Sequence, residues 1–152
     1  MGLYYITGVS GSGKSEVRLK LRELGYEAYG TDEDGIAFFY NNETGETVDK
    51  PIDAPPRSLE WRNAHTWKAS REKFEELALE AKDRTIFICG GVNNDDEVWD
   101  LFSDVAALVI SKETLIPRIK NRTGNNFGKS DHELNDILKW QETAEEIFRK
   151  LG

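Results

Sequence analysis

An eight-residue run near the N-terminus has the residue types and the spacing needed to bind phosphate. The run Gly8-Val9-Ser10-Gly11-Ser12-Gly13-Lys14-Ser15 matches the pattern G-x-x-x-x-G-K-[ST] in full. Glycines lack a Cβ, so successive N–H groups can turn inward towards phosphate oxygens. Lys14 would reach the β- and γ-phosphates, and the Ser15 hydroxyl would bind Mg²⁺. The run therefore predicts a site for a nucleoside triphosphate and magnesium.

The flanking segments predict the elements that must position this loop. An apolar run, 3–7, predicts a strand before it, and a helix is expected from about Lys14, with Val17, Leu21 and Leu24 on one face and Gly25 as its cap. The N-terminal end of that helix carries partial positive charge and would face the phosphates. This strand–loop–helix context disfavours the alternative, a glycine-rich turn with an incidental lysine.

The composition bounds the class of protein. A chain of 152 residues is long enough for one domain, which we place at 1–152, and too short for two. The net charge of -8 argues against a nucleic-acid binder, and no stretch is long and apolar enough for a membrane span. The N-terminal strand does not resemble a signal peptide, and the single cysteine, Cys89, fits a reducing, cytoplasmic location. Five basic residues between Lys112 and Lys129 predict either a polyanion site or a solvated helix face.

The rest of the chain alternates between strand and helix patterns. We expect strands at 27–30 and 85–89, a buried strand at 105–110, and a small hairpin from Ile36 to about Val48. Residues 51–56 read as a loop. The helical patterns cover 58–82 (with a break), a short stretch from Asn94 to about Phe102, 112–122, and a last helix opened by the capping box 130–133. This order predicts an α/β fold, a doubly wound parallel sheet with helices on both faces.

In such a sheet, ligands bind beyond the carboxyl ends of the strands. The phosphate loop, the acidic turn Thr31-Asp32-Glu33-Asp34 and the turn Gly90-Gly91 all follow strands, so we expect them to meet. No aspartate ends the strand 86–89, which makes Asp32 the better candidate for a magnesium carboxylate. The alternative for both aspartates is a solvated turn. The helical spacing of Trp61 and Trp67 favours core packing, and core packing is also expected for Trp99 and Trp140. His65 and Cys89 are expected to have structural roles.

Together with Trp61-Arg62 and the pair Arg118 and Arg122, these motifs resemble the small P-loop kinases, which include shikimate kinase, gluconate kinase and adenylate kinase. The short motifs are most similar to the shikimate kinase branch, and an AAA-type ATP-binding protein is a related description. The resemblance implies ATP and Mg²⁺ as cofactors. It also implies an acceptor-binding segment at about 31–70 and a lid at about 118–130.

On the acceptor side, the resemblance implies that Asp34 binds the acceptor hydroxyl, close to where a base would act. Arg62 would clamp an acceptor carboxylate, and Gly90 and Gly91 would form the acceptor turn. Asp32 would support the magnesium shell with Ser15.

On the nucleotide side, the resemblance places Arg118 near adenine and lets Arg122 reach the transferred phosphate. The catalytic set is therefore Lys14, Asp34 and Arg122. The nucleotide-binding set is Gly8, Ser10, Gly11, Ser12, Gly13, Lys14, Ser15, Glu16 and Arg118.

The chain departs from the shikimate kinase pattern at three points. His65 stands where a glutamate usually follows the aromatic–Arg pair, only two glycines follow Cys89, and 38–56 has no counterpart. The chain ends at Gly152, directly after the last helix, so we expect either a shortened chain or a sheet that lacks its final edge strand.

Three functions fit these residues. The first is transfer of the ATP γ-phosphate to a hydroxyl of a small molecule, by a monomer or weak dimer. The second is a nucleoside monophosphate kinase of the adenylate kinase type, with an acceptor pocket from Arg57, Arg62 and the tryptophans. The third is a nucleotide-dependent switch or binding module without an acceptor, which would use 38–56 for its partner.

Overall fold

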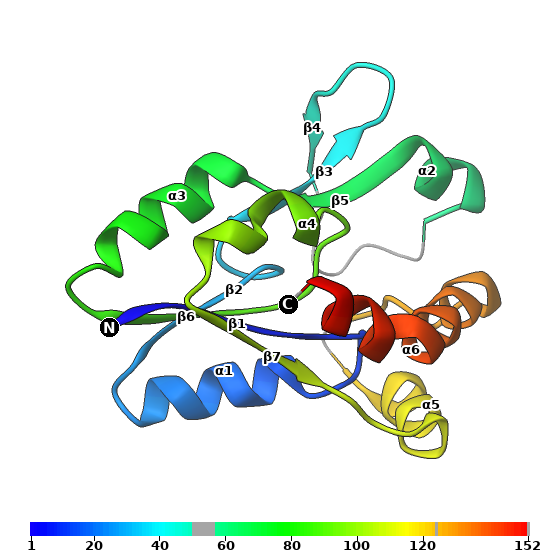
Figure 1. The fold of residues 1–152 in the computed structure, drawn as a ribbon. Helices are drawn as coiled ribbons and strands as arrows, with labels where there is room; N and C mark the ends of the chain where they lie inside the picture. The colour runs from blue at the N-terminus through cyan, green and yellow to red at the C-terminus, as the bar shows by residue number, and fades with distance from the viewer. Residues whose placement is uncertain (50–56, 124, 152) are drawn as a thin grey trace.

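A parallel four-stranded sheet forms the centre of the protein in the computed structural model, which describes residues 1–49, 57–123 and 125–151 (Figure 1). Its strands lie in the order β2-β6-β1-β7, and neighbouring strands are parallel throughout. All four carboxyl ends therefore meet at one edge of the sheet. The strands are β1 (Gly2–Gly8), β2 (Glu27–Gly30), β6 (Thr85–Cys89) and β7 (Asp104–Leu108).

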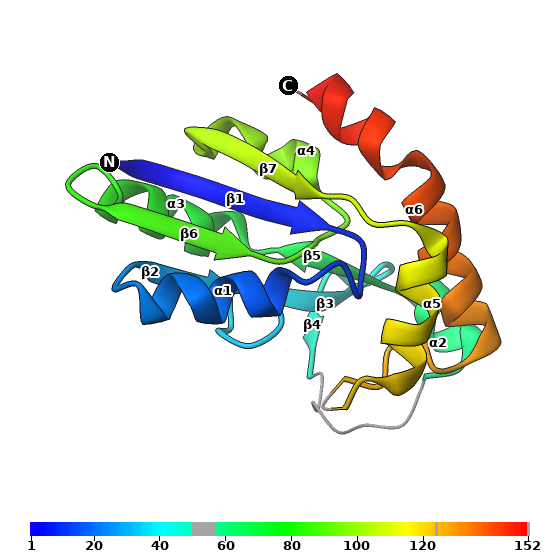
Figure 2. The same cartoon turned by 90° about the horizontal axis from the view of Figure 1, so that it is seen from below.

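Helices cover both faces of this sheet, which confirms the predicted doubly wound fold (Figure 1). Helix α1 (Lys14–Glu23) packs on one face, against β2 and β6. The other face is covered by α3 (Arg71–Glu80), α4 (Asp95–Val98) and the 3-10 turn η1 (Trp99–Leu101). Figure 2 shows α5 (Lys112–Asn121) and α6 (Asp131–Leu151) beyond the carboxyl ends of the strands.

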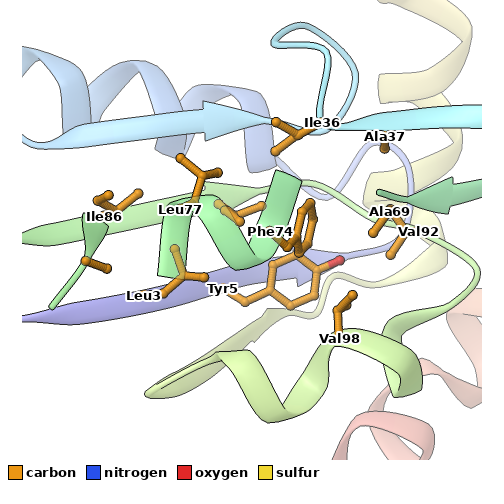
Figure 3. Close-up of a cluster of buried hydrophobic side chains, with 12 residues drawn as sticks. Leu3, Tyr5, Ile36, Ala37, Ala69, Phe74, Leu77, Ile86, Val92 and Val98 are labelled. Atoms are coloured by element: carbon orange, nitrogen blue, oxygen red, sulfur yellow. The ribbon is translucent and has the colours of Figure 1, made fainter. Parts of the chain in front are cut away.

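Two apolar clusters hold these layers in place. The larger lies between the sheet and α3, where Tyr5 and Phe74 are fully buried (Figure 3). Tyr5 also stacks on Phe102, at 4.7 Å between ring centroids. The smaller joins α5 to α6 through Leu115, Ile119 and Ile137. Since Val9 packs against this second cluster, the phosphate loop and the two helices beyond the sheet form one packed unit.

A second, antiparallel sheet lies at the same end of the molecule. It consists of β3 (Ala37–Asn41), β4 (Thr47–Val48) and β5 (His65–Ala69), in the order β4-β3-β5. The hairpin of β3 and β4 was predicted, and the expected break in the helical pattern over 58–82 is present, although it is a strand. Only α2 (Leu59–Ala64) and α3 are helical there, because β5 pairs along the whole of β3, with Phe39 opposite Trp67. The predicted 51–56 loop lies outside the described residues.

Two predictions of buried structure are also corrected. The strand expected at 105–110 is not buried: β7 pairs with β1 on one side, no strand among the described residues pairs with its other side, and Ala106 and Ala107 are exposed. Trp140 is not a core residue, since 41% of its surface is exposed on α6, whereas Trp99 packs against the larger cluster.

Candidate active site at the carboxyl edge of the sheet

A cavity of about 630 Å³ lies where the carboxyl ends of β1 and β6 meet the small sheet and α6. It brings together the phosphate loop, the acidic turn after β2 and the glycine turn after β6, as the strand order predicts. Helix α6 and the loop before it form the facing wall. Of the residues predicted for the site, Gly8, Ser10, Lys14, Asp32, Arg62 and Gly91 line the cavity.

The phosphate loop has the backbone geometry that its glycines predict. Gly13 is the N-cap of α1 with a φ of 105°, in the left-handed region that favours glycine. The Lys14 ammonium donates to the carbonyl oxygens of Gly8 (2.6 Å) and Val9 (2.7 Å). Burial lowers the pKa of Lys14 to about 8, while the negative charge of Asp32 acts in the opposite direction. Lys14 is therefore a desolvated cation held inside the loop.

This lowered pKa predicts that ATP binding at pH 8 takes up about half a proton per site. Lys14 is half protonated there in the free protein, and contact with phosphate anions raises its pKa, so the bound state holds more protons. The affinity for ATP accordingly falls as pH rises through 8. Titration calorimetry in two buffers of different ionisation enthalpy measures the uptake, and Lys14→Ala should lack it. Proton release on binding would contradict this assignment.

The other loop residues surround the phosphate site without lining the cavity. Ser12 is buried, Gly11 lies against Leu115 and Ile119, and Glu16 lies near Gly13. Arg118, predicted for the nucleotide, comes close to the loop: its guanidinium lies 3.6 Å from the position that a Cβ on Gly13 would take. The structure therefore places Arg118 beside the loop.

The Ser15 hydroxyl lies near a carboxylate that the sequence reasoning did not assign. Its Oγ is 3.5 Å from Oε1 of Glu33, which also pairs with Arg18 at 3.4 Å. The Glu33 carboxylate occupies the space into which a side chain on Gly30 would project, 1.9 Å from that Cβ position. No group of three or more His, Cys, Asp or Glu side chains among the described residues could hold a metal ion by itself. Ser15 with Glu33 and Asp32 fits Mg²⁺ of the kind bound largely through nucleotide phosphates.

The two aspartates of the acidic turn point to different places. Asp32 lines the cavity. Asp34 does not; its Oδ2 accepts hydrogen bonds from the backbone N–H of Gly30 (2.6 Å) and from Arg22 (3.1 Å), and Arg18 lies at 3.4 Å. The structure thus brings Asp32 to the site and holds Asp34 against α1, away from any acceptor in the cavity.

Asp34→Asn is therefore expected to affect stability more than activity. The asparagine keeps an acceptor oxygen for Gly30 but loses the charge that pairs with Arg18 and Arg22, and charge-assisted hydrogen bonds of this kind contribute about 1–3 kcal/mol. We expect a lower thermal midpoint and a kcat within about threefold of the parent, measured by calorimetry and by ADP release. A kcat loss of a hundredfold with an unchanged midpoint would restore Asp34 as the base.

The glycine turn after β6 lies very close to the acidic turn after β2. A Cβ on Gly90 would lie 1.9 Å from Oγ1 of Thr31, so a side chain there would force the acidic turn away. Gly91 lines the cavity, and its carbonyl oxygen accepts a hydrogen bond from Nε1 of Trp67 (3.0 Å). Trp67 of the small sheet is thereby fixed against the carboxyl edge of the parallel sheet.

Asp95, at the start of α4, is a cavity residue that the sequence analysis missed. The hydroxyl of Tyr5, whose side chain is buried between the sheet and α3 (Figure 3), donates to Oδ1 of Asp95 at 2.8 Å. No hydrogen bond to Oδ2 is found among the described residues. Burial raises the pKa of Asp95 to about 6, against the lowering effects of the Tyr5 hydrogen bond and the Lys14 charge. The strand-end rule that placed the glycine turn could have found it, because Asp95 follows four residues after Gly91.

Asn94, the residue before Asp95, is hydrogen-bonded to the small sheet. Its side chain is buried and bonds both the N–H (2.7 Å) and the C=O (3.3 Å) of Ala69 at the end of β5, rather than capping α4 through its own oxygen. Its Nδ2 also donates to Glu97 at 2.9 Å. The position of Asp95 is therefore set from two sides, by β1 and by β5.

Arg62 lines the cavity from α2, but its guanidinium is already paired with a carboxylate of the protein. Its guanidinium donates to Oδ2 of Asp136 (2.7 Å) and contacts Nδ1 of His132 (2.9 Å), both on α6. The predicted carboxylate clamp is therefore paired with a carboxylate of the protein itself.

Arg122 reaches the phosphate loop from the segment predicted as a lid. It donates to Oγ of Ser10 at 3.0 Å and to the carbonyl of Phe127. Burial lowers its pKa from the usual value, yet no hydrogen-bond partner for its Nε is found among the described residues. The guanidinium thus lies beside the phosphate loop, and its Nε–H is available to donate a further hydrogen bond.

Comparison with known families identifies the family of the chain. The sequence model of a family described as "AAA domain" matches residues 5–140. The chain therefore belongs to this AAA domain family, and the matched range includes the run at 8–15. No curated protein matches the chain in sequence. None of the helices among the described residues combines the length and apolar character needed to cross a membrane.

Solved structures of small P-loop kinases share the fold. Shikimate kinase from Acinetobacter baumannii in complex with shikimate superposes with a TM-score of 0.55 at 20% identity, over 100% of this chain and 80% of that chain. Deoxyadenosine kinase from M. mycoides with bound dATP gives a TM-score of 0.53 at 17% identity, over 98% and 84%. At these identities the likeness establishes a P-loop kinase fold and leaves the substrate undetermined.

Proposed function

We propose that the protein is an ATP-dependent kinase that transfers the γ-phosphate to a hydroxyl of a small molecule. The observation that carries this proposal is the cavity itself, in which Lys14 of the phosphate loop and the carboxylates of Asp32 and Asp95 line one space. A cation for the phosphates and carboxylates for the acceptor are what phosphoryl transfer to a hydroxyl needs, because the reaction depends on positioning and on charge neutralisation.

The nucleotide side is assigned as the sequence predicted. Lys14 moves from the loop carbonyls to the β- and γ-phosphates when ATP binds, and Arg118 lies towards the nucleoside. Ser15 and Asp32, with Glu33 behind them, would hold Mg²⁺. Magnesium held there would supply positive charge against the phosphates.

We assign the acceptor side to Asp95 in place of Asp34. The oxygen of the acceptor hydroxyl attacks the γ-phosphorus. As it does so, Oδ2 of Asp95 accepts the proton of that hydroxyl. The bond between that phosphorus and the β,γ-bridging oxygen breaks, and ADP leaves with the electron pair. The proton then passes from Asp95 to solvent. A pKa of about 6 keeps most of Asp95 ionised at pH 7.5 and suits a general base.

Arg122 and the predicted lid, 118–130, complete the site in this proposal. The guanidinium of Arg122 beside Ser10 stabilises the charge on the transferred phosphoryl group, and the segment excludes water when it covers the site. Water exclusion matters because a kinase must favour its acceptor over hydrolysis.

The two other functions make different predictions at the same cavity. A nucleoside monophosphate kinase needs a cation for the acceptor phosphate, and Arg62 is paired with Asp136. A switch without an acceptor has no use for a second carboxylate held opposite Lys14. The cavity therefore favours a hydroxyl acceptor.

A coupled ADP-release assay with Mg-ATP tests the proposal directly. The panel holds nucleosides, nucleoside monophosphates and hydroxy acids, including shikimate and gluconate. We expect one hydroxyl compound to raise ADP release above the rate without acceptor. Tight ATP binding with no stimulation by any class would favour the switch instead.

A further inference from the structure

The chemistry of the cavity wall indicates which class of acceptor it takes. Much of the cavity wall is aromatic. Phe39 of β3 contacts both Trp61 and Trp67, each at 4.9 Å between ring centroids. On the α6 side, Phe127 and Trp140 stack at 6.3 Å with an interplanar angle of 19°. All five rings line the cavity.

The charges on the same wall oppose an anionic acceptor. Among the described residues that line the cavity, the carboxylates Asp32, Asp95, Glu133 and Asp136 outnumber the cations Lys14, Arg57 and Arg62. Lys14 is needed for the ATP phosphates, and Arg62 is bound by Asp136 and His132. A carboxylate or phosphate on the acceptor would have to displace Asp136 from its ion pair with Arg62, whose side chain is only 14% exposed, and this exchange is unfavourable.

Arg57, the remaining cation among the described residues that line the cavity, is held against the aromatic wall. Its guanidinium lies over the ring of Trp61 at 4.3 Å and over Phe39 at 5.2 Å. Burial lowers its pKa from the usual value. The contact is a cation–π interaction that completes the aromatic wall.

Neutral hydrogen-bonding groups are plentiful by contrast. Four amide side chains, Asn63, Asn93, Asn125 and Asn126, line the cavity. An amide presents both donors and an acceptor, the set that reads the edges of a nitrogen heterocycle. Trp67, held by its bond to the Gly91 carbonyl, offers a fixed ring close to the phosphate loop on which such a heterocycle can stack.

We infer that the phosphate acceptor is an uncharged molecule with a planar heteroaromatic ring and an alcohol, of which nucleosides are the accessible class, and not a hydroxy acid or a nucleotide. This inference rests on the proposed function, since it names the acceptor of the same reaction. It also explains why the pair Trp61-Arg62 is present although the charge of Arg62 is paired with that of Asp136.

Matched acceptors test the inference. ADP release is measured with the common ribo- and deoxyribonucleosides, with their 5′-monophosphates, and with shikimate and gluconate. We expect at least one nucleoside to be a substrate and its monophosphate to be at least about tenfold poorer in kcat/KM. Turnover of a hydroxy acid or a monophosphate in preference to every nucleoside would overturn the inference and leave the kinase assignment standing.

Binding provides a readout that does not depend on turnover. Calorimetric titration of nucleosides into the full chain with a non-hydrolysable ATP analogue should show saturable binding for the preferred one. Trp67→Leu is expected to weaken it by about tenfold or more, because stacking on an aromatic side chain contributes that much per base. Trp67→Phe should retain most of the affinity, and Trp99→Leu, outside the cavity lining, should retain all of it.

The two failures are distinguishable. Nucleoside binding without phosphoryl transfer would overturn the proposed function alone. The absence of any nucleoside binding, with ATP bound normally, would overturn the acceptor class. Equal affinity of the Trp67→Leu and parent proteins, with thermal midpoints confirming that both are folded, would also contradict it.

Discussion

Lys14→Ala is expected to lower the rate of γ-phosphoryl transfer by about 10²–10³-fold and to weaken ATP binding. The side chain supplies the cation of the phosphate loop, and removing one such group from a desolvated site costs this much in transition-state stabilisation. Transfer is measured by ADP release at saturating Mg-ATP, and binding by calorimetry.

Lys20→Ala is the matched control, because Lys20 lies on the same helix but is exposed and pairs only with Glu23 among the described residues. Its kinetics should match the parent. Thermal unfolding shows whether Lys14→Ala is folded, which we expect since the substitution removes a cation whose burial is unfavourable. A folded Lys14→Ala protein that binds ATP and turns over normally would contradict the nucleotide site.

Asp95→Asn is expected to lower kcat by about 10²–10⁴-fold, the contribution of a positioned general base. The parent kcat should rise with pH through about 6 as Asp95 ionises, and the variant should lack this limb. Asparagine still accepts the Tyr5 hydrogen bond. Because burial raises the pKa of Asp95, the folded state disfavours its charged form, so the neutral variant should be at least as stable as the parent at pH 7.5.

Two further variants separate chemistry from structure at this position. Tyr5→Phe removes the hydrogen bond that lowers the pKa of Asp95, so the acid limb of the kcat profile should move to higher pH. Asp96→Asn alters the neighbouring carboxylate, which does not line the cavity, and should change kcat little. If the kcat of Asp95→Asn stays within about threefold of the parent value and still rises with pH through about 6, Asp95 is not the base.

The sequence alone was enough to predict the phosphate loop and the parallel sheet. Both rest on local rules: an eight-residue pattern in a strand–loop–helix context, and apolar runs such as 85–89 between helical patterns. The rule that ligands bind at strand ends also predicted correctly that Gly91 and Asp32 would share a cavity with Lys14.

The roles of the aspartates could not be read in the same way. Asp32 and Asp34 are equivalent by spacing, and only their contacts distinguish them: Asp34 turns back to Arg18 and Arg22 on α1. Asp95 lies in an acidic run that reads as an ordinary helix start, and its role depends on the Tyr5 hydroxyl, 90 positions away in the chain.

The same limit applies to β5. Residues 65–69 sit within a helical pattern, and the strand forms because β3 offers a complete antiparallel partner, a long-range pairing that outweighs local preference. The aromatic wall depends on this strand, since it carries Trp67 to the glycine turn.

The most direct test of the central claim is phosphorus NMR of Mg-ATP incubated with the protein and the acceptor that stimulates ADP release. The account predicts that the γ-phosphate signal is replaced by that of a phosphate monoester of the acceptor, in equal amount to the ADP formed, and that Asp95→Asn slows this conversion. Formation of inorganic phosphate alone, with the acceptor unchanged, would show that the cavity supports hydrolysis and not phosphoryl transfer.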